Sequence, residues 1–221
     1  MTQLRLDTGQ VIAVRELVIA GWTGRDEAAV AHHIAELAAL GVPAPSSVPL
    51  YYRAGAELLT HAAQIDTVGA DSSGEAEPLL ICDSAGDVWL GLASDHTDRA
   101  LEAVSVAKSK QICPKPVARS LWRLADLDGR LDDLVLRAEI EEGGAWVPYQ
   151  EGTLAEIRPL AALITGLPGG QLAPGMAMLC GTLPAIGGIR PAPRFRMQLI
   201  DPARKVAISH EYTVTALPVV A

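Results

Sequence analysis

The chain has 221 residues, of which 49% are apolar and 20% charged, and its formal net charge is −8. This length suits one large domain or two small ones, and because no linker divides the chain we expect a single domain over residues 1–221. The acidic balance argues against a nucleic-acid partner, since phosphate binding needs a basic face.

Cysteine usage and the N-terminal residues bear on the cellular compartment. Cys82, Cys113 and Cys180 are scattered and odd in number, which fits a reducing compartment better than a disulfide framework. The first residues contain no apolar signal-like segment, and no run reaches the roughly 18 apolar residues of a membrane span. We therefore expect a cytoplasmic protein with no membrane contact.

The first 40 residues predict three strands and a helix. Apolar alternation predicts two short strands within residues 3–14, and the apolar segment Leu17–Ala20 predicts a buried third strand. A helix is expected from about Glu27 to Leu40, because apolar residues recur there at helical spacing. His33 and Glu36 lie three apart and so share one side of this helix, where such a pair is most often a surface ion pair worth a few tenths of a kcal/mol.

A pair of glutamates, Glu75 and Glu77, stands in the middle of the chain. Residues two apart on a strand share a face, so the two carboxylates would raise each other's pKa unless a cation sits between them. The strand-like segment 87–93 brings Asp95 to its end. Three hard oxygen ligands without a Cys or a well-spaced His suit Mg²⁺, Mn²⁺ or Ca²⁺ rather than zinc. Taken alone, the pattern is also that of a solvated acidic turn.

The remaining elements are predicted from the period of their apolar residues. Helices are expected at residues 98–106, at 120–137 and from 150 onward. Strands are expected within residues 58–69, in a hairpin over 137–149, and at 194–200 and 206–217.

The Glu-x-Glu pair followed by Asp95-His-Thr-Asp-Arg99 resembles the fumarylacetoacetate hydrolase superfamily. The metal site of that superfamily contains a Glu-x-Glu pair and the first Asp of an Asn-Asp-x-Thr/Ser-Ala-Arg-Asp stretch. The resemblance therefore implies Glu75, Glu77 and Asp95 as metal ligands and Arg99 as a substrate-binding residue. The chain is most similar to a short bacterial branch of unknown function, DUF2848, and the likeness runs from about residue 21 to 217.

The resemblance changes the interpretation of the first helix. Superfamily members carry a Gly-Arg-Asn-Tyr-x-x-His-x-x-Glu lid whose His–Glu dyad activates water. Gly24-Arg25 followed by His33-Ile-Ala-Glu36 is similar, although the Asn-Tyr is missing and the spacing is longer. The resemblance implies His33 as the general base and Glu36 as the carboxylate that fixes its tautomer, with His32 as the alternative base.

Residues 107–116 resemble a Lys-Ser-Phe…Cys-Pro segment of the superfamily, whose lysine faces the active site. Lys108 is the better match for that lysine, and Lys110 is the alternative. Without the resemblance, two lysines near a loop are equally consistent with a solvated surface.

Residues 172–184 resemble the Leu-x-Pro-Gly-Asp…Thr-Gly-Thr-Pro pattern of the superfamily. A strand ending in Gly-Thr offers a hydroxyl and free N–H groups, so Thr182 is expected to bind a substrate carboxylate. Glu102 stands where many relatives carry a glutamine that faces the substrate. We expect it either to accept a hydrogen bond from a donor group of the substrate or to pair with Arg99.

The resemblance implies an α+β, strand-rich fold, a rolled β-sandwich with a few peripheral helices that pairs as a homodimer. It implies a metal-dependent hydrolase that cleaves a carbon–carbon bond in a small anionic 2-oxo acid or 1,3-dicarbonyl, acylpyruvate-like substrate through a metal-bound enolate. Decarboxylases, isomerases, hydratases and lyases of the superfamily use the same kind of site. A non-catalytic metal- or ligand-binding protein is the alternative outside the enzymes.

Overall fold

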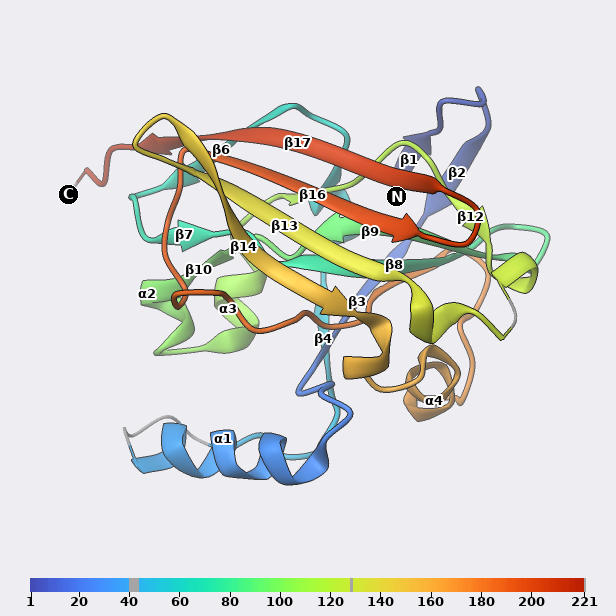
Figure 1. Cartoon of the computed structure of the whole chain (residues 1–221), viewed down its shortest axis with the longest axis horizontal. Helices are drawn as coiled ribbons and strands as arrows, with labels where there is room; N and C mark the ends of the chain where they lie inside the picture. The colour runs from blue at the N-terminus through green and yellow to red at the C-terminus, as the bar shows by residue number, and fades with distance from the viewer. Residues whose placement is uncertain (40–43, 128, 221) are drawn as a thin grey trace.

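Two β-sheets dominate the computed structural model, which describes residues 1–39, 44–127 and 129–220 (Figure 1). The six-stranded sheet has the order β12 (Trp122–Arg123), β9 (Val88–Ser94), β8 (Ala76–Cys82), β15 (Met176–Leu179), β3 (Glu16–Gly21) and β4 (Leu50–Ala54). The five-stranded sheet has the order β14 (Ala145–Thr153), β13 (Val135–Glu142), β16 (Arg194–Asp201), β17 (Val206–Leu217) and β6 (Gln64–Val68). The pairs β15–β3 and β17–β6 are parallel, and the other neighbouring strands are antiparallel.

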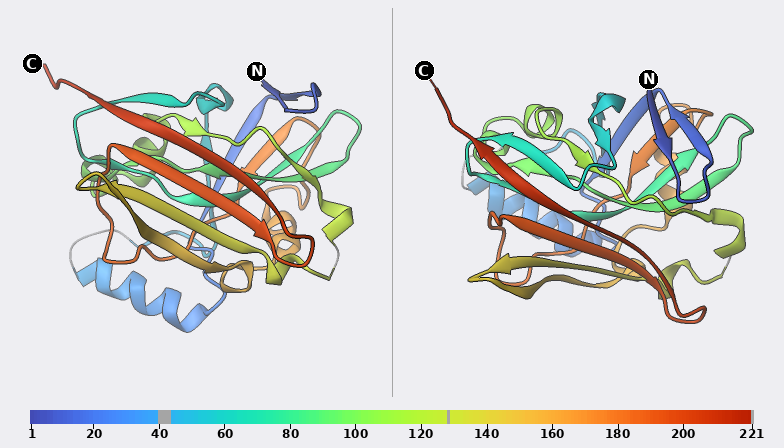
Figure 2. Two further views of the ribbon diagram at one scale, coloured as in Figure 1. Left: turned by 45° about the horizontal axis from the view of Figure 1, so that its top comes forward. Right: turned by 90° about the horizontal axis from the view of Figure 1, so that it is seen from above.

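The two sheets pack face to face as a sandwich (Figures 1 and 2). Leu80 and Leu92 of the first sheet belong to the same buried cluster as Leu136 and Met197 of the second. Burial of these side chains excludes water from the space between the sheets and is the main stabilising term of such a fold.

The six-stranded sheet is buried on both faces. Leu79 and Ile81 of β8 point away from the sandwich and lie in a second cluster with Leu4 and Ile12. These last two residues come from the hairpin formed by β1 (Thr2–Arg5) and β2 (Val11–Val14), which covers the outer face. Double burial explains why β8 is continuously apolar from Leu79 to Cys82 rather than alternating.

The strand-rich α+β fold expected from the sequence is confirmed, including the three N-terminal strands, the 137–149 hairpin and the two C-terminal strands. Helix α1 (Glu27–Ala39) also forms where it was predicted. It begins after Asp26, whose carboxylate accepts the N–H groups of Ala28 and Ala29 at 2.9 and 3.0 Å. Leu40, the expected end of the helix, lies outside the described residues.

The helix predicted over residues 120–137 is wrong. The segment instead contains β12, the 3₁₀ turns η2 (Leu124–Leu127) and η3 (Leu131–Asp133), and the start of β13. Leu127 and Leu134 are both fully buried, and from Val135 onward the backbone pairs with β14 and β16. The leucine spacing therefore reflects a chain that follows the edge of the core, not one face of a helix.

Two further helices differ from their expected bounds. The segment 98–106 splits into α2 (Arg99–Glu102) and α3 (Val106–Gln111), and the Asp98 carboxylate caps α2 by accepting the N–H of Leu101 at 2.8 Å. The helix expected from residue 150 starts later, because β14 continues to Thr153. A 3₁₀ turn, η4 (Leu154–Glu156), then precedes α4 (Leu160–Gly166).

Short elements complete the structure around the sandwich. They are η1 (Ala56–Leu58), β5 (Leu59–Thr60), β7 (Ser72–Ser73), β10 (Thr97–Asp98) and β11 (Lys115–Pro116). Strand β10 pairs with β7, and β11 pairs with β5. Among the described residues, no helix has the length and apolar character needed to cross a membrane.

Candidate metal and active site

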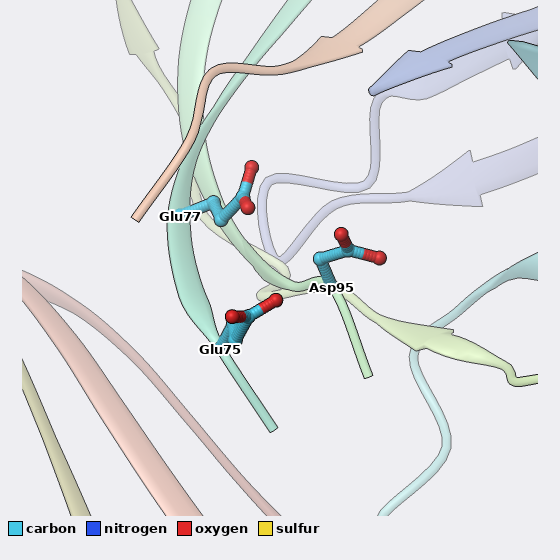
Figure 3. A group of neighbouring side chains, drawn as sticks. All are labelled: Glu75, Glu77 and Asp95. Carbon is cyan, nitrogen blue, oxygen red and sulfur yellow. The ribbon is translucent and has the colours of Figure 1, made fainter. Parts of the chain in front are cut away.

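Glu75, Glu77 and Asp95 meet at one end of the β8–β9 ladder. Ala76 pairs with Ser94 in that ladder, and just beyond it the Asp95 N–H donates to the Glu75 carbonyl at 2.9 Å. Glu75 therefore lies opposite Asp95, and Glu77 lies two residues along on the same face. Figure 3 shows the three side chains beside one another, and one oxygen of each carboxylate lies within 4.8 Å of the others. The structure thus brings together the predicted metal ligands.

The Glu77 carboxylate is held by the backbone of a neighbouring loop. Its side chain is buried, and the Gly181 N–H donates to Oε2 at 2.7 Å. Gly181 has a φ of +95°, and a Cβ at this position would lie 1.6 Å from Oγ1 of the buried Thr23. Glycine is therefore required at 181, because both the backbone conformation and the approach of Thr23 exclude a side chain.

The backbone between the two glutamates is held by Gln150 and Thr182. The Ala76 N–H donates to Oε1 of Gln150 at 2.9 Å, and the Ala76 carbonyl accepts the Thr182 hydroxyl at 2.7 Å. Gln150 Nε2 in turn donates to Thr182 Oγ1 at 2.6 Å. Thr182 thus uses its proton to hold the Glu-x-Glu backbone, and its expected contact with a substrate carboxylate stays a prediction.

Buried cations surround the carboxylates. Lys115 Nζ lies 2.9 Å from Oδ1 of Asp95, and Lys110 Nζ contacts Oδ2. Lys110 is also 3.9 Å from Glu75 Oε2. Burial opposes ionisation of Asp95, but Lys110 and Lys115 outweigh it and lower the pKa of this carboxyl group. The pKa of Glu77 is raised well above its usual value, first by burial and then by the Asp95 charge.

The lysine that reaches the cluster is Lys110, not Lys108. Both belong to α3, but Lys108 is exposed, whereas Lys110 is 7% exposed. The sequence-based preference for Lys108 as the lysine facing the site is therefore corrected in favour of Lys110. Lys115, which is fully buried, was missed, and nothing in its sequence position distinguishes it from a surface lysine.

Arg99 joins the cluster to Glu102. Its Nη2 lies 3.3 Å from Oε1 of Glu75, its Nη1 donates to Oε2 of Glu102 at 2.7 Å, and its Nε donates to Oγ of Ser73 at 2.7 Å. The ion pair, one of the two roles considered for Glu102, is thus present. A contact of Glu102 with substrate stays a prediction.

Helix α1, which carries His33 and Glu36, lies on the outside of the two sheets (Figures 1 and 2). The side chains of these two residues lie outside the described part of the chain, so their proposed roles stay predictions. His32, the alternative base, is exposed. The N-terminal end of α1 is anchored by Arg25, which pairs with Asp132 at 2.7 Å.

The chemistry of the cluster fits a divalent cation. Its carboxylate oxygens are the hard ligands that Mg²⁺, Mn²⁺ and Ca²⁺ prefer, and the group contains no cysteine or histidine donor. The pKa of Glu77 is raised because its carboxyl group is buried and lies close to that of Asp95. A bound cation would offset the repulsion between the carboxylates.

A family profile described as a protein of unknown function, DUF2848, matches residues 20–212. The chain belongs to the DUF2848 family. No curated protein matches this DUF2848 chain.

Solved structures similar to this DUF2848 protein share its fold. A Burkholderia cenocepacia protein assigned as a fumarylpyruvate hydrolase has 17% sequence identity and a TM-score of 0.67, over 98% of this chain and 95% of its own. A Yersinia pestis CO92 protein assigned to the fumarylacetoacetate hydrolase family has 16% identity and a TM-score of 0.67, over 97% and 100% of the two chains. A 2-keto-3-deoxy-D-arabinonate dehydratase in complex with magnesium and 2,5-dioxopentanoate has 13% identity and a TM-score of 0.66, over 93% and 74%. The fumarylacetoacetate hydrolase-like fold expected from the sequence is thereby confirmed.

Proposed function

We propose that this DUF2848 protein is a metal-dependent hydrolase that cleaves a carbon–carbon bond in a small 2-oxo acid or 1,3-dicarbonyl substrate. The observation that carries the proposal is the convergence of three carboxylates, within 4.8 Å of one another, beside three buried or nearly buried cations. A structural ion site needs only the carboxylates. The added cations favour a site that also binds an anion.

Glu75, Glu77 and Asp95 would hold Mg²⁺ or Mn²⁺, with Ca²⁺ as the alternative, and the ion would act as a Lewis acid on the substrate carbonyl groups. Lys110 and Arg99 would attract the substrate carboxylate and stabilise negative charge that develops during cleavage. Binding of an anion depends on the positive charge close to the site, so the net charge of −8 does not prevent it.

His33 is proposed to accept a proton from the water that attacks the distal carbonyl of the substrate. Glu36, three residues along the same helix, would hold the imidazole in the tautomer that accepts this proton. The position of α1 outside the sandwich, after the glycines Gly21 and Gly24, supports a lid that approaches the cluster when substrate binds.

A dehydratase is the second candidate, because a similarly folded protein is a 2-keto-3-deoxy-D-arabinonate dehydratase that was solved with magnesium. Dehydration of a 2-oxo acid uses the same kind of ion site and expels water instead of adding it. A decarboxylase or lyase would likewise keep the ion and dispense with the attacking water.

The test is turnover of a substrate panel by metal-depleted protein with and without added Mg²⁺ or Mn²⁺. Acylpyruvates, oxaloacetate and 2-keto-3-deoxy sugar acids represent hydrolysis, decarboxylation and dehydration. Metal-dependent release of pyruvate and a second acid from an acylpyruvate supports the proposal. Release of CO₂ or of a dehydrated 2-oxo acid instead would favour the alternative reactions. Ion binding without turnover of any compound would contradict the hydrolase assignment.

A further inference from the structure

A chain of hydrogen bonds, buried from Ser94 onward, connects the backbone of Glu75 to the opposite sheet. The Glu75 N–H donates to Oγ of Ser94 at 3.2 Å, and the Ser94 hydroxyl lies 2.8 Å from the hydroxyl of Tyr212. Tyr212 belongs to β17 of the five-stranded sheet, whereas Ser94 ends β9 of the six-stranded sheet. A metal ligand at the end of one sheet is thus joined to the other sheet through two hydroxyl groups.

The chain continues beyond Tyr212 through His96. The Tyr212 hydroxyl lies 3.0 Å from Nδ1 of His96, and Nε2 of His96 lies 3.0 Å from the hydroxyl of Ser72. Ser72 donates to the hydroxyl of Thr67 at 3.1 Å. One direction of donation, from Glu75 toward Thr67, satisfies every one of these links when His96 carries its proton on Nε2.

Because these groups are buried, the loss of any one hydrogen bond in the chain would be costly. Ser94, His96 and Tyr212 are each at most 1% exposed, so water cannot replace a lost partner. The Tyr212 ring is also fixed by packing, since it meets His96 edge-on at 5.7 Å between centroids and Phe195 at 5.5 Å. The hydroxyl of Tyr212 is therefore presented to Ser94 from a rigid position.

Gly74 allows the tyrosine hydroxyl to come this close to the metal ligands. A Cβ at residue 74 would lie 2.5 Å from the Tyr212 hydroxyl and 2.7 Å from Cδ2 of Phe195. The residue directly before Glu75 thus lacks a side chain at the point where Tyr212 reaches the β8–β9 end. The glycine at position 74 therefore leaves room for the contact between Tyr212 and Ser94.

We propose that Tyr212 is a positioning residue of the metal site, which fixes the direction of Glu75 through Ser94. The inference rests on the proposed function, because it assigns Tyr212 to the same ion site. Glu75 is the ligand that most needs such support, since its side chain is 16% exposed whereas that of Asp95 is fully buried. Groups behind the ligands of a metal site commonly change its affinity by about 10- to 100-fold.

The variant that tests this role is Tyr212→Phe, with Tyr149→Phe as the matched control. Both tyrosines are 1% exposed and both pack against Phe195, but the Tyr149 hydroxyl accepts an N–H from Arg190 at 3.4 Å and lies outside the chain of hydrogen bonds. Mn²⁺ affinity is measured by calorimetry and by the electron paramagnetic resonance signal of free and bound ion. We expect about tenfold weaker Mn²⁺ binding in Tyr212→Phe and an unchanged affinity in Tyr149→Phe.

A double-mutant cycle separates positioning of Glu75 from a general loosening of the fold. In a Glu75→Gln background Tyr212→Phe should cause little further loss of Mn²⁺ affinity, whereas in a Lys110→Met background, which keeps all three carboxylates, its effect should persist. Equal losses in both backgrounds, or undiminished binding in Tyr212→Phe, would overturn the inference alone. Absence of Mn²⁺ binding in the unmodified protein would overturn the proposed function and the inference with it.

Discussion

The carboxylate cluster and helix α1 are held in opposite ways, although the proposed reaction uses both. The backbone around Glu75 and Glu77 is fixed by hydrogen bonds that it donates to Gln150 and Ser94 and by one that it accepts from Thr182. Helix α1, by contrast, lies outside the sandwich, and most of its described side chains are exposed. A carboxylate cluster in the sandwich and a separate helix can be altered independently, so substitutions should separate ion affinity from turnover.

The largest effect is expected from Glu77→Gln. This change keeps the volume of the side chain but removes a charged ligand, so Mg²⁺ and Mn²⁺ affinity should fall by more than the roughly 100-fold seen for groups behind the ligands. Calorimetry on metal-depleted protein measures the loss, and Glu102→Gln is the control because Glu102 pairs with Arg99 outside the trio. Undiminished binding in Glu77→Gln would mean that the ion binds elsewhere.

In helix α1, the substitution His33→Ala should lower kcat by about 100-fold or more, the usual scale for a lost general base. Its Mn²⁺ affinity should remain that of the unmodified protein, because α1 contributes no residue to the carboxylate trio. His32→Ala is the matched control on the same helix. If His32→Ala abolishes turnover and His33→Ala does not, the base is His32.

Lys110→Met and Lys108→Met form a second matched pair. Lys110 contacts Asp95, whereas Lys108 is exposed on the same helix, so kcat/KM on an anionic substrate should fall by about 10- to 100-fold in the first variant alone. Ion affinity in Lys110→Met should not fall, because a cation next to the ligands has been removed. A loss of kcat/KM confined to Lys108→Met would restore the sequence-based preference.

Ion binding should strengthen as the pH rises. The pKa of Glu77 is raised by burial and by Asp95, so in metal-free protein this carboxyl group keeps its proton at a pH where an ordinary glutamate has lost it. An ion needs the ionised form, and affinity should therefore rise by up to about tenfold per pH unit until the pH passes that raised pKa. Calorimetry in buffers of different ionisation enthalpy measures the released proton. Binding that releases no proton and does not depend on pH would contradict this assignment.

The smallest effect is expected from Glu102→Gln. If Glu102 accepts a hydrogen bond from the substrate, this variant should improve turnover of simple acylpyruvates and reduce turnover of 2-oxo acids that carry an amide or hydroxyl donor. The shift should be a few-fold, on the order of one hydrogen bond. Selectivity that does not change would leave Glu102 as the ion-pair partner of Arg99.

The meeting of Glu75, Glu77 and Asp95 could be predicted from the sequence, because their motifs resemble those of the superfamily and because strand geometry is regular. Alternation places Glu75 and Glu77 on one face, and antiparallel pairing brings the end of β9, with Asp95, opposite them. The choice between Lys108 and Lys110 could not be made in this way. Residues two apart on a helix point about 200° away from each other, so the packing of α3 on its neighbours decides which lysine is buried.

Tertiary packing also explains the other discrepancies. The leucines between residues 120 and 137 pack one after another along the edge of the sandwich. Their spacing resembles that of a helix, but β13 pairs with β14 and β16, so the end of this segment is a strand. The contact of Tyr212 with Ser94 joins residues 118 positions apart in the sequence. No local pattern marks such a pair, and it becomes visible when the two sheets are packed together.

Anomalous diffraction from crystals grown with Mn²⁺ would locate the bound ion directly. We expect one manganese peak between the carboxylates of Glu75, Glu77 and Asp95, with oxygen ligands at about 2 to 2.5 Å. The peak should be absent from crystals of Glu77→Gln grown under the same conditions. A manganese peak at another position, or an ordered carboxylate trio without a peak at saturating Mn²⁺, would contradict this expectation.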